Sequence, residues 1–186
     1  MTLDDALADV RDAFLQIEFS IKLLGYCEHG NIDSSEFDTH EVVLLEHGTL
    51  GFPSGSFSTQ SEIIRAASVA VSLALAGSAL SLDKAWDIAG IPPDPRSEDR
   101  RVKLRTLVYM VRCAFAHGVA DPKWEVRRDY CRILEIDLAN GPLRLDLREL
   151  HGRNFDFDQL GGHAGWFDIH EESVAELAEL NAAASE

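Results

Sequence analysis

The chain has 186 residues, of which 46% are apolar, and this length and composition fit one soluble globular domain and argue against an intrinsically disordered chain. The formal net charge of −15 at pH 7 would repel nucleic acid and anionic membranes if it were spread evenly over the surface. The distribution of charge along the chain therefore matters more than the total.

The cysteines and the apolar runs bear on where the protein works. Cys27, Cys113 and Cys131 are widely spaced and form no C-x-x-C pair, which argues against disulfides and structural zinc and favours a reducing cytoplasm. We expect no signal peptide, because aspartates interrupt the apolar residues after Met1. The longest uncharged run, residues 66–82, has 17 residues and is shorter than the ~20 of a membrane span, so we expect a buried central helix and no membrane partner.

The first predicted helix begins near Leu3 and ends near Leu24. Its apolar residues alternate in steps of four and three, which gives one narrow seam: Leu3, Leu7, Val10, Phe14, Ile17, Ile21 and Leu24. From Glu28 to Thr59 we expect a long connecting loop, punctuated by glycines, in which only Val42 to Leu45 is typical of a short strand. Such a loop either connects the helices or covers a site.

A second predicted helix runs from about Thr59 to Leu82, with small residues such as Gly77 that would allow another helix to approach closely. A short helical turn from Lys84 to Ala89 follows it. Three prolines, Pro92, Pro93 and Pro95, then end any helix and make a stiff connection.

The third predicted helix has Ser97 as its cap and Gly118 as its stop. Its core stripe consists of Leu104, Leu107, Val108, Val111, Ala114 and Phe115. At 100° per residue, Arg101, Arg105 and Arg112 lie along one edge of this stripe. The three arginines form either a ridge that binds an anion or a ladder of salt bridges.

After this helix the apolar period changes to two, which predicts a β-hairpin on either side of Asn140-Gly141. Trp124 to Arg127 is a candidate further strand, Gly161-Gly162 with Gly165 predicts a loop, and a final helix is expected from about Glu171 to Ala183. The predicted fold is mainly α, a helical bundle with an added C-terminal β-hairpin. We expect a single domain over 1–186, with the bundle in about 1–120 and the hairpin and final helix in about 121–186.

The positive charge is concentrated in the segment from Arg96 to Arg132, which we call the basic island. It holds ten of the 17 Lys and Arg residues against five acidic residues, so its balance is +5 and the rest of the chain sums to −20. An island of this kind either faces an anion or pairs with the protein's own carboxylates.

Within the island, Arg112 and His117 form an R-x4-H arrangement in the last turns of the predicted helix. Histidine moves a proton near neutral pH, and arginine offers a bidentate fork to a phosphate, so the pair suits phosphoryl chemistry. Five positions along a helix separate the two side chains by about 140°, and they would not point at one atom within one chain. A symmetric dimer would bring both copies of each residue together.

The string from Val111 to Gly118, followed by Pro122-Lys123-Trp124, resembles the HEPN superfamily (higher eukaryotes and prokaryotes nucleotide-binding). The resemblance implies a helical bundle that dimerises, and a metal-independent endoribonuclease of toxin–antitoxin or defence systems, without a cofactor and with RNA and a cognate antitoxin or other protein as partners. It also implies that Arg112 and His117 are the catalytic pair. Arg112 would bind the scissile phosphate, and His117 would assist attack by the ribose 2′-hydroxyl or protonate the leaving oxygen. We place Arg101, Arg105, Tyr109 and Cys113 as candidate substrate-binding residues.

One departure from the family pattern supports an alternative. The residue after the arginine is often a polar Asn or Asp in active members and is Cys113 here, and a thiol is a poor hydrogen-bonding substitute. The alternative is a catalytically silent HEPN-like module for dimerisation or binding. In the simplest interpretation, Arg112 is a structural ion-pair partner and His117 only caps the helix.

Other chemistries have less support in the sequence. His163, Asp168 and His170 match no zinc-binding spacing, and we expect their segment to pack Trp166 and Phe167, so we predict no metal site. The chain also lacks G-x-G-x-x-G, P-loop and G-x-S-x-G motifs.

Overall fold

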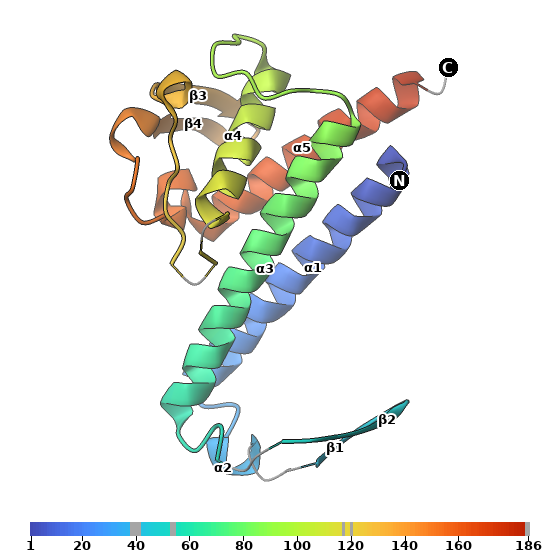
Figure 1. Ribbon diagram of the computed structural model, residues 1–186, viewed down its shortest axis with the longest axis vertical. Helices are drawn as coiled ribbons and strands as arrows, with labels where there is room; N and C mark the ends of the chain where they lie inside the picture. The colour runs from blue at the N-terminus through green and yellow to red at the C-terminus, as the bar shows by residue number, and fades with distance from the viewer. Residues whose placement is uncertain (38–41, 53–54, 117, 120, 185–186) are drawn as a thin grey trace. The chain divides into compact units, whose positions relative to one another are not determined.

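The structure, a computed structural model, describes residues 1–37, 42–52, 55–116, 118–119 and 121–184. It is mainly helical with two small antiparallel hairpins, which confirms the expected fold class at that level (Figure 1). The chain groups into two compact units. Unit 1 comprises residues 1–14 and 75–186, and unit 2 comprises residues 15–74.

Unit 1 is built around helix α4 (Arg100–Phe115). This helix packs against the hairpin of β3 (Ile133–Leu138) and β4 (Gly141–Asp146) and against α5 (Gly162–Ala184), as Figure 1 shows. Every residue of the predicted apolar stripe of α4 is buried. Three tryptophans, Trp86, Trp124 and Trp166, complete the core and are each about 1% exposed or less.

The β3–β4 hairpin confirms the prediction from the period of two. Leu134 pairs with Leu145 and Ile136 with Leu143. Leu134, Ile136 and Leu145 are buried, because alternate residues of a strand face the same side and this side packs on α4. Gly141, the first residue of β4, has a φ of 129°, a conformation that a glycine adopts without strain.

Unit 2 contains the second part of α1 (Leu3–Glu28) and the first part of α3 (Gln60–Ile88). Its small core consists of Cys27, Ile63 and Ala67, and the Gln60 side chain donates a hydrogen bond of 2.7 Å to the Cys27 carbonyl. The predicted strand Val42–Leu45 is confirmed as β1. The rest of the prediction for this segment, an irregular loop, was wrong, because the segment also contains α2 (Ser34–Phe37) and β2 (Gly48–Gly51), which pairs with β1.

Unit 2 exposes an unusual amount of apolar surface. It carries twelve of the fourteen large apolar side chains that are exposed in the described part of the chain. Every residue of β1 and β2 is exposed, and Leu44 reaches 80%. A lone two-stranded hairpin is at best marginally stable in water, and exposed apolar patches of this kind mark interaction surfaces.

The predicted end of α3 and the predicted N-cap of α4 were wrong, and each error has a physical reason. α3 continues through residues 83–88 because Asp83 and Asp87 pair with Arg105 and Trp86 is buried, so the charges do not interrupt the helix. The N-cap of α4 is Asp99, not Ser97, and its carboxylate accepts a hydrogen bond of 3.0 Å from the Val102 amide.

α5 begins at Gly162, nine residues before the predicted start at Glu171, so the predicted loop at Gly165 lies within a helix. The candidate strand at Trp124 to Arg127 was also wrong. Only one isolated bridge, between Lys123 and Asn154, forms beside it.

Helix α3 is long and apolar enough to cross a membrane by length and composition, and 44% of its most apolar window is buried. Ala79, Leu82 and Ala85 of this helix are among the buried core residues of unit 1. At Gly77, an added Cβ would meet nothing within 4 Å, so the close helix approach predicted at this residue is absent.

Candidate functional site

The three arginines on the edge of α4 form a ladder of salt bridges. Arg101 pairs with Glu176 at 2.6 Å and with Glu179 at 3.6 Å, both on α5. Arg105 is 1% exposed and pairs with Asp83 and Asp87, each at 2.5 Å. This burial speaks against the predicted contact of Arg105 with a substrate.

Arg112 differs from the other two arginines of the ladder. Its side chain is 37% exposed, and its Nε atom lies 3.7 Å from Asp83, whose other oxygen binds Arg105. Nε is buried and has no hydrogen-bond partner among the described residues. Asp83 therefore holds one side of the Arg112 guanidinium by charge alone, and the guanidinium remains partly accessible to a ligand.

A hollow of about 230 Å³ brings Arg112 together with two of the predicted substrate-binding residues, Tyr109 and Cys113. The last turns of α4 form one wall, and the segment from Glu125 to Tyr130 forms the other. Arg101 and Arg105 do not line it. Arg127, on the second wall, is exposed and pairs with no carboxylate in the described parts of the chain.

The aromatic residues at this hollow form an ordered stack. The Arg105 guanidinium lies 5.8 Å from the centroid of the Tyr109 ring, and the Tyr130 ring lies 5.5 Å from Tyr109 at an angle of 36°. Burial, and then a hydrogen bond with the Cys113 thiol, raise the pKa of Tyr109 to about 12. Burial also raises the pKa of Tyr130. Both hydroxyls therefore keep their protons at neutral pH and remain donors.

Helix α4 ends before the predicted stop at Gly118. Its last residue is Phe115, and Ala116 caps it. The Ala114 carbonyl accepts a hydrogen bond of 3.0 Å from the Lys123 amide, which ties the end of the helix to the following segment. His117, and with it the predicted 140° separation from Arg112, lies outside the described residues.

Most of the positive charge of the basic island is neutralised by carboxylates. Seven of its ten cations have a carboxylate partner: Arg96, Arg100, Arg101, Lys103, Arg105, Arg112 and Lys123. Within the described ranges, the three without one are Arg127, Arg128 and Arg132. The uncompensated charge of the island therefore lies in the segment 127–132, directly beside the hollow.

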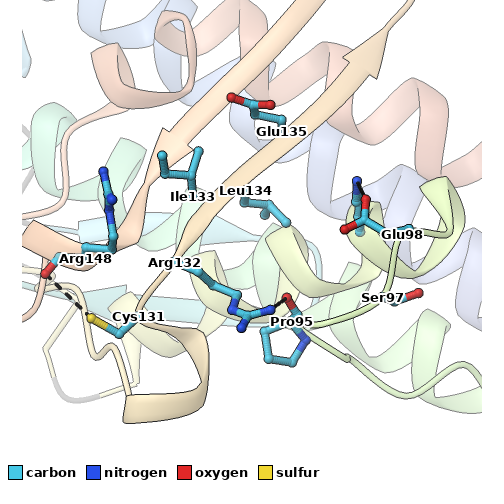
Figure 2. Close-up of a pocket in the computed structure, with 10 residues that line it drawn as sticks. Pro95, Ser97, Glu98, Cys131, Arg132, Ile133, Leu134, Glu135 and Arg148 are labelled. Atoms are coloured by element: carbon cyan, nitrogen blue, oxygen red, sulfur yellow. Dashed lines mark hydrogen bonds and ion pairs between the residues drawn. The ribbon is translucent and has the colours of Figure 1, made fainter.

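A second hollow, of about 380 Å³, is lined by residues that include Cys131 and Arg132 of this segment (Figure 2). Its cations have protein partners. Arg132 donates to the Pro95 carbonyl at 3.1 Å, Arg148 pairs with Asp146 at 2.5 Å, and Lys103 pairs with Glu98 at 2.6 Å. Because its donors are already engaged, this hollow is the weaker candidate for an anion site.

The histidines of α5 are packing residues. His163 stacks on Phe157 with ring centroids 4.8 Å apart, and His170 stacks on Phe14 at 3.7 Å. Asp168 accepts a hydrogen bond from Asn140 at 2.7 Å. In the part of the chain that the structure describes, no group of three or more His, Cys, Asp and Glu side chains gathers as a metal site would require.

Sequence reasoning missed the role of Asp83 and the contribution of Arg127 and Tyr130. Asp83 and Asp87 stand four residues apart at the end of an apolar run, a spacing that places them on one helix face and signals a cationic partner. Arg127 ended the candidate strand from Trp124, and Tyr130 lies in a short 3-10 helix, Arg128–Tyr130, before β3, so the predicted strand pattern did not indicate that they form a wall of the hollow.

Comparison of the chain with protein-family models, with curated proteins and with solved structures found no match.

Proposed function

We propose that the protein is a metal-independent endoribonuclease of HEPN type that acts in the cytoplasm as a homodimer. The observation that supports this most is the placement of Arg112. It is partly exposed, held on one side by Asp83, and borders a hollow beside Tyr109 and Arg127, which has no carboxylate partner within the described ranges. These groups suit a phosphate and an adjoining base, the two parts of an RNA strand that a ribonuclease must hold.

The proposed reaction needs only side chains and the ribose of the substrate. Arg112 binds the non-bridging oxygens of the scissile phosphate and stabilises the charge that grows there. His117 of one copy accepts the proton of the 2′-hydroxyl, whose oxygen attacks phosphorus, and His117 of the other protonates the leaving 5′-oxygen as the P–O bond breaks. The products are a 2′,3′-cyclic phosphate and a 5′-hydroxyl, and no metal enters the reaction.

Cleavage of RNA in EDTA tests this proposal. We expect the wild-type protein to cleave single-stranded RNA, and His117→Ala and Arg112→Ala to lower the rate by about 10²-fold or more, as the loss of a general acid–base group does. Arg144→Ala is the matched control, because Arg144 is an exposed arginine paired with Glu135, away from the hollow. Equal rates in all four proteins, or no cleavage by the wild type, would contradict the proposal.

The alternative function is a catalytically silent module that dimerises or binds a partner. The observations that favour it are the exposed apolar surface of unit 2 and the burial of Cys113, whose thiol is a poor hydrogen-bonding substitute for the polar residue of active members. The segment from Val42 to Phe52 carries only Glu46 and His47 as titratable residues, so two copies would meet there without strong repulsion.

RNA cleavage separates the two functions, because both involve a dimer, and sedimentation velocity tests the dimer surface of the alternative. Under the alternative, the wild-type protein is a dimer without RNA cleavage, and Leu44→Lys shifts it to monomers because a charge replaces the most exposed leucine of β1. If the wild type is monomeric, or if Leu44→Lys leaves the dimer intact, this hairpin does not serve as the dimer surface.

A further inference from the structure

One cation of the basic island without a carboxylate partner in the described ranges borders a small site. Arg127 lines the hollow of about 230 Å³ together with Arg112, and Glu125 is its one acidic residue. Two guanidinium groups against one carboxylate leave the lining with a formal charge of +1. In a protein with a net charge of −15, a small positive hollow is set apart from its surroundings and attracts an anionic group.

The hollow also carries an aromatic platform that is assembled in the free protein. Arg105, buried and fixed by two carboxylates, lies against Tyr109, and Tyr109 lies against Tyr130. Tyr130 lines the hollow and is half-buried, so part of its side chain remains accessible. Because its contact with Tyr109 already restricts the Tyr130 side chain, Tyr130 can stack on the planar ring of a ligand at little cost in side-chain entropy.

We propose that this hollow is a nucleotide subsite, in which one base of a single-stranded RNA stacks on Tyr130 and the adjoining phosphate pairs with Arg127. The inference rests on the proposed ribonuclease function for the identity of its ligand as RNA. It deepens that function by assigning the binding of a neighbouring nucleotide to residues beyond Arg112 and His117. Because Arg112 borders the same hollow, the bound nucleotide lies next to the scissile phosphate.

The size and lining of the hollow favour one nucleotide over other ligands. Pockets for drug-sized molecules measure about 300–1,000 Å³, and this hollow is smaller. A simple anion would use the two arginines but not the tyrosine, whereas a base with its phosphate uses both kinds of group. A double helix keeps its bases stacked on one another, so the subsite selects single strands.

Binding of an RNA that cannot be cleaved tests the subsite separately from catalysis. The probe is a short, fluorescein-labelled oligoadenylate with 2′-O-methyl riboses, which lack the attacking hydroxyl, and the readout is fluorescence anisotropy in EDTA at several salt concentrations. We expect Tyr130→Ala to weaken binding by about five-fold to one-hundred-fold and Tyr130→Phe to leave it unchanged, since stacking needs the ring and not the hydroxyl.

Arg127→Ala gives a second, independent test, because Arg127 is exposed and its replacement does not disturb the core. We expect weaker binding and a slope of log affinity against log salt that is about 0.7 smaller in magnitude, the value for one phosphate contact with a single strand. Arg144→Ala is the control for a change of charge elsewhere and should bind as the wild type does.

The outcomes separate the subsite from the ribonuclease proposal. If the wild type cleaves RNA but Tyr130→Ala and Arg127→Ala bind the probe as tightly as Arg144→Ala, the ribonuclease stands and the subsite is refuted. If both variants lose binding while no form cleaves RNA, the subsite stands and the ribonuclease is refuted. A wild-type protein that does not bind the probe at all overturns the subsite.

Discussion

Arg105 and Arg112 occupy the same edge of α4, seven residues apart, and share the carboxylate of Asp83, yet their environments assign them different tasks. Arg105 has no access to solvent and engages Asp83, Asp87 and the Ile91 carbonyl, so its guanidinium is part of the core. Arg112 lies 3.7 Å from the second oxygen of Asp83 and remains partly exposed. A helical wheel cannot separate the two, because they differ in depth and not in angle.

Replacing Arg105 should be among the most destabilising changes in unit 1. Arg105→Met keeps most of the side-chain volume but leaves Asp83, which is 13% exposed, without its closest cation. We expect a loss of about 3–5 kcal/mol in the free energy of unfolding, measured with urea, because an uncompensated buried charge remains. Arg101→Met, which removes a more exposed ion pair, should cost about 1 kcal/mol or less, and equal effects of the two would refute the assignment.

His170 makes stability depend on pH. Burial lowers the pKa of His170 to about 4, and the ring stacks on Phe14 with its Nε2 atom lacking a hydrogen-bond partner among the described residues. An unfolded chain binds the proton below about pH 6.5, whereas the folded protein binds it only below about pH 4. In this window the unfolded state holds more protons, so stability is lost as the pH falls from 6.5 to 4.

His170→Phe removes this titration and keeps an aromatic ring against Phe14. We expect wild-type stability to fall between pH 7 and pH 4 by on the order of 2–3 kcal/mol more than that of the variant. Urea unfolding of both proteins at several pH values measures the difference. A stability difference between the two proteins that is the same at pH 7 and at pH 4 would show that His170 is not the source.

At the scale of elements, the start of α5 is fixed by a close backbone approach. The segment Phe157–Leu160 turns into α5 through Gly161 and Gly162, whose φ values are 86° and 79°. A Cβ placed on Gly165 would lie 1.8 Å from the Leu160 carbonyl oxygen. Only a glycine at position 165 lets the first turn of α5 pack on this segment, so the glycines that predicted a loop serve a helix.

Gly165→Ala should therefore destabilise the protein, by about 1–3 kcal/mol or more, because backbone atoms and not a flexible side chain must move. Gly77→Ala is the matched control within a helix, since its Cβ meets nothing within 4 Å, and we expect it to stabilise by about 0.5–1 kcal/mol. Thermal unfolding by circular dichroism measures both. A Gly165→Ala protein as stable as the wild type would contradict the close contact.

The elements that the sequence predicted well are those with a local cause. The seam of α1, the stripe of α4 and the β3–β4 hairpin each follow from a period within one segment, and residues such as Val10, Leu107 and Ile136 are buried as expected. The predicted helix boundaries were wrong where contacts with residues distant in the sequence determine the local structure. Asp83 stays in a helix because Arg105 neutralises it, and at the end of α4 the Ala114 carbonyl accepts a hydrogen bond from the distant Lys123 amide.

The candidate site shows the same division. Arg112, Tyr109 and Cys113 share one helix, and their meeting at one hollow could be predicted from the motif and helical spacing. The second wall, with Arg127 and Tyr130, comes from a segment that the sequence pattern wrongly predicted as a strand up to Arg127, and it is placed by tertiary contacts such as those of Trp124 with Arg153 and Gly152. The motif therefore predicted the wall that α4 forms and not the opposite wall.

For the whole molecule, the charge pattern and the apolar surface bear on assembly. The basic island does not present a broad positive face, because most of its cations pair with the protein's own carboxylates and only the segment 127–132 remains uncompensated. Long-range attraction to RNA is therefore weak in a chain of net charge −15, and local contacts must supply the affinity. A second copy of the chain would double these contacts and bring two such hollows to one strand.

Mixing two inactive variants tests whether the proposed active site is shared between copies. Arg112→Ala and His117→Ala, each inactive alone, form mixed dimers in which one copy supplies the arginine and the other the histidine. We expect RNA cleavage by the mixture to rise about tenfold or more above that of either variant, because the mixed dimer holds one intact Arg112 for the phosphate and one intact His117 as acid or base, whereas each variant alone lacks one of the two groups altogether. Mixing Arg112→Ala with the double variant should restore nothing, since no histidine is then paired with an intact arginine. Cleavage by the first mixture that merely equals the sum of its parts would mean that each site lies within one chain, and the dimer would then have to be explained by the apolar surface of unit 2 alone.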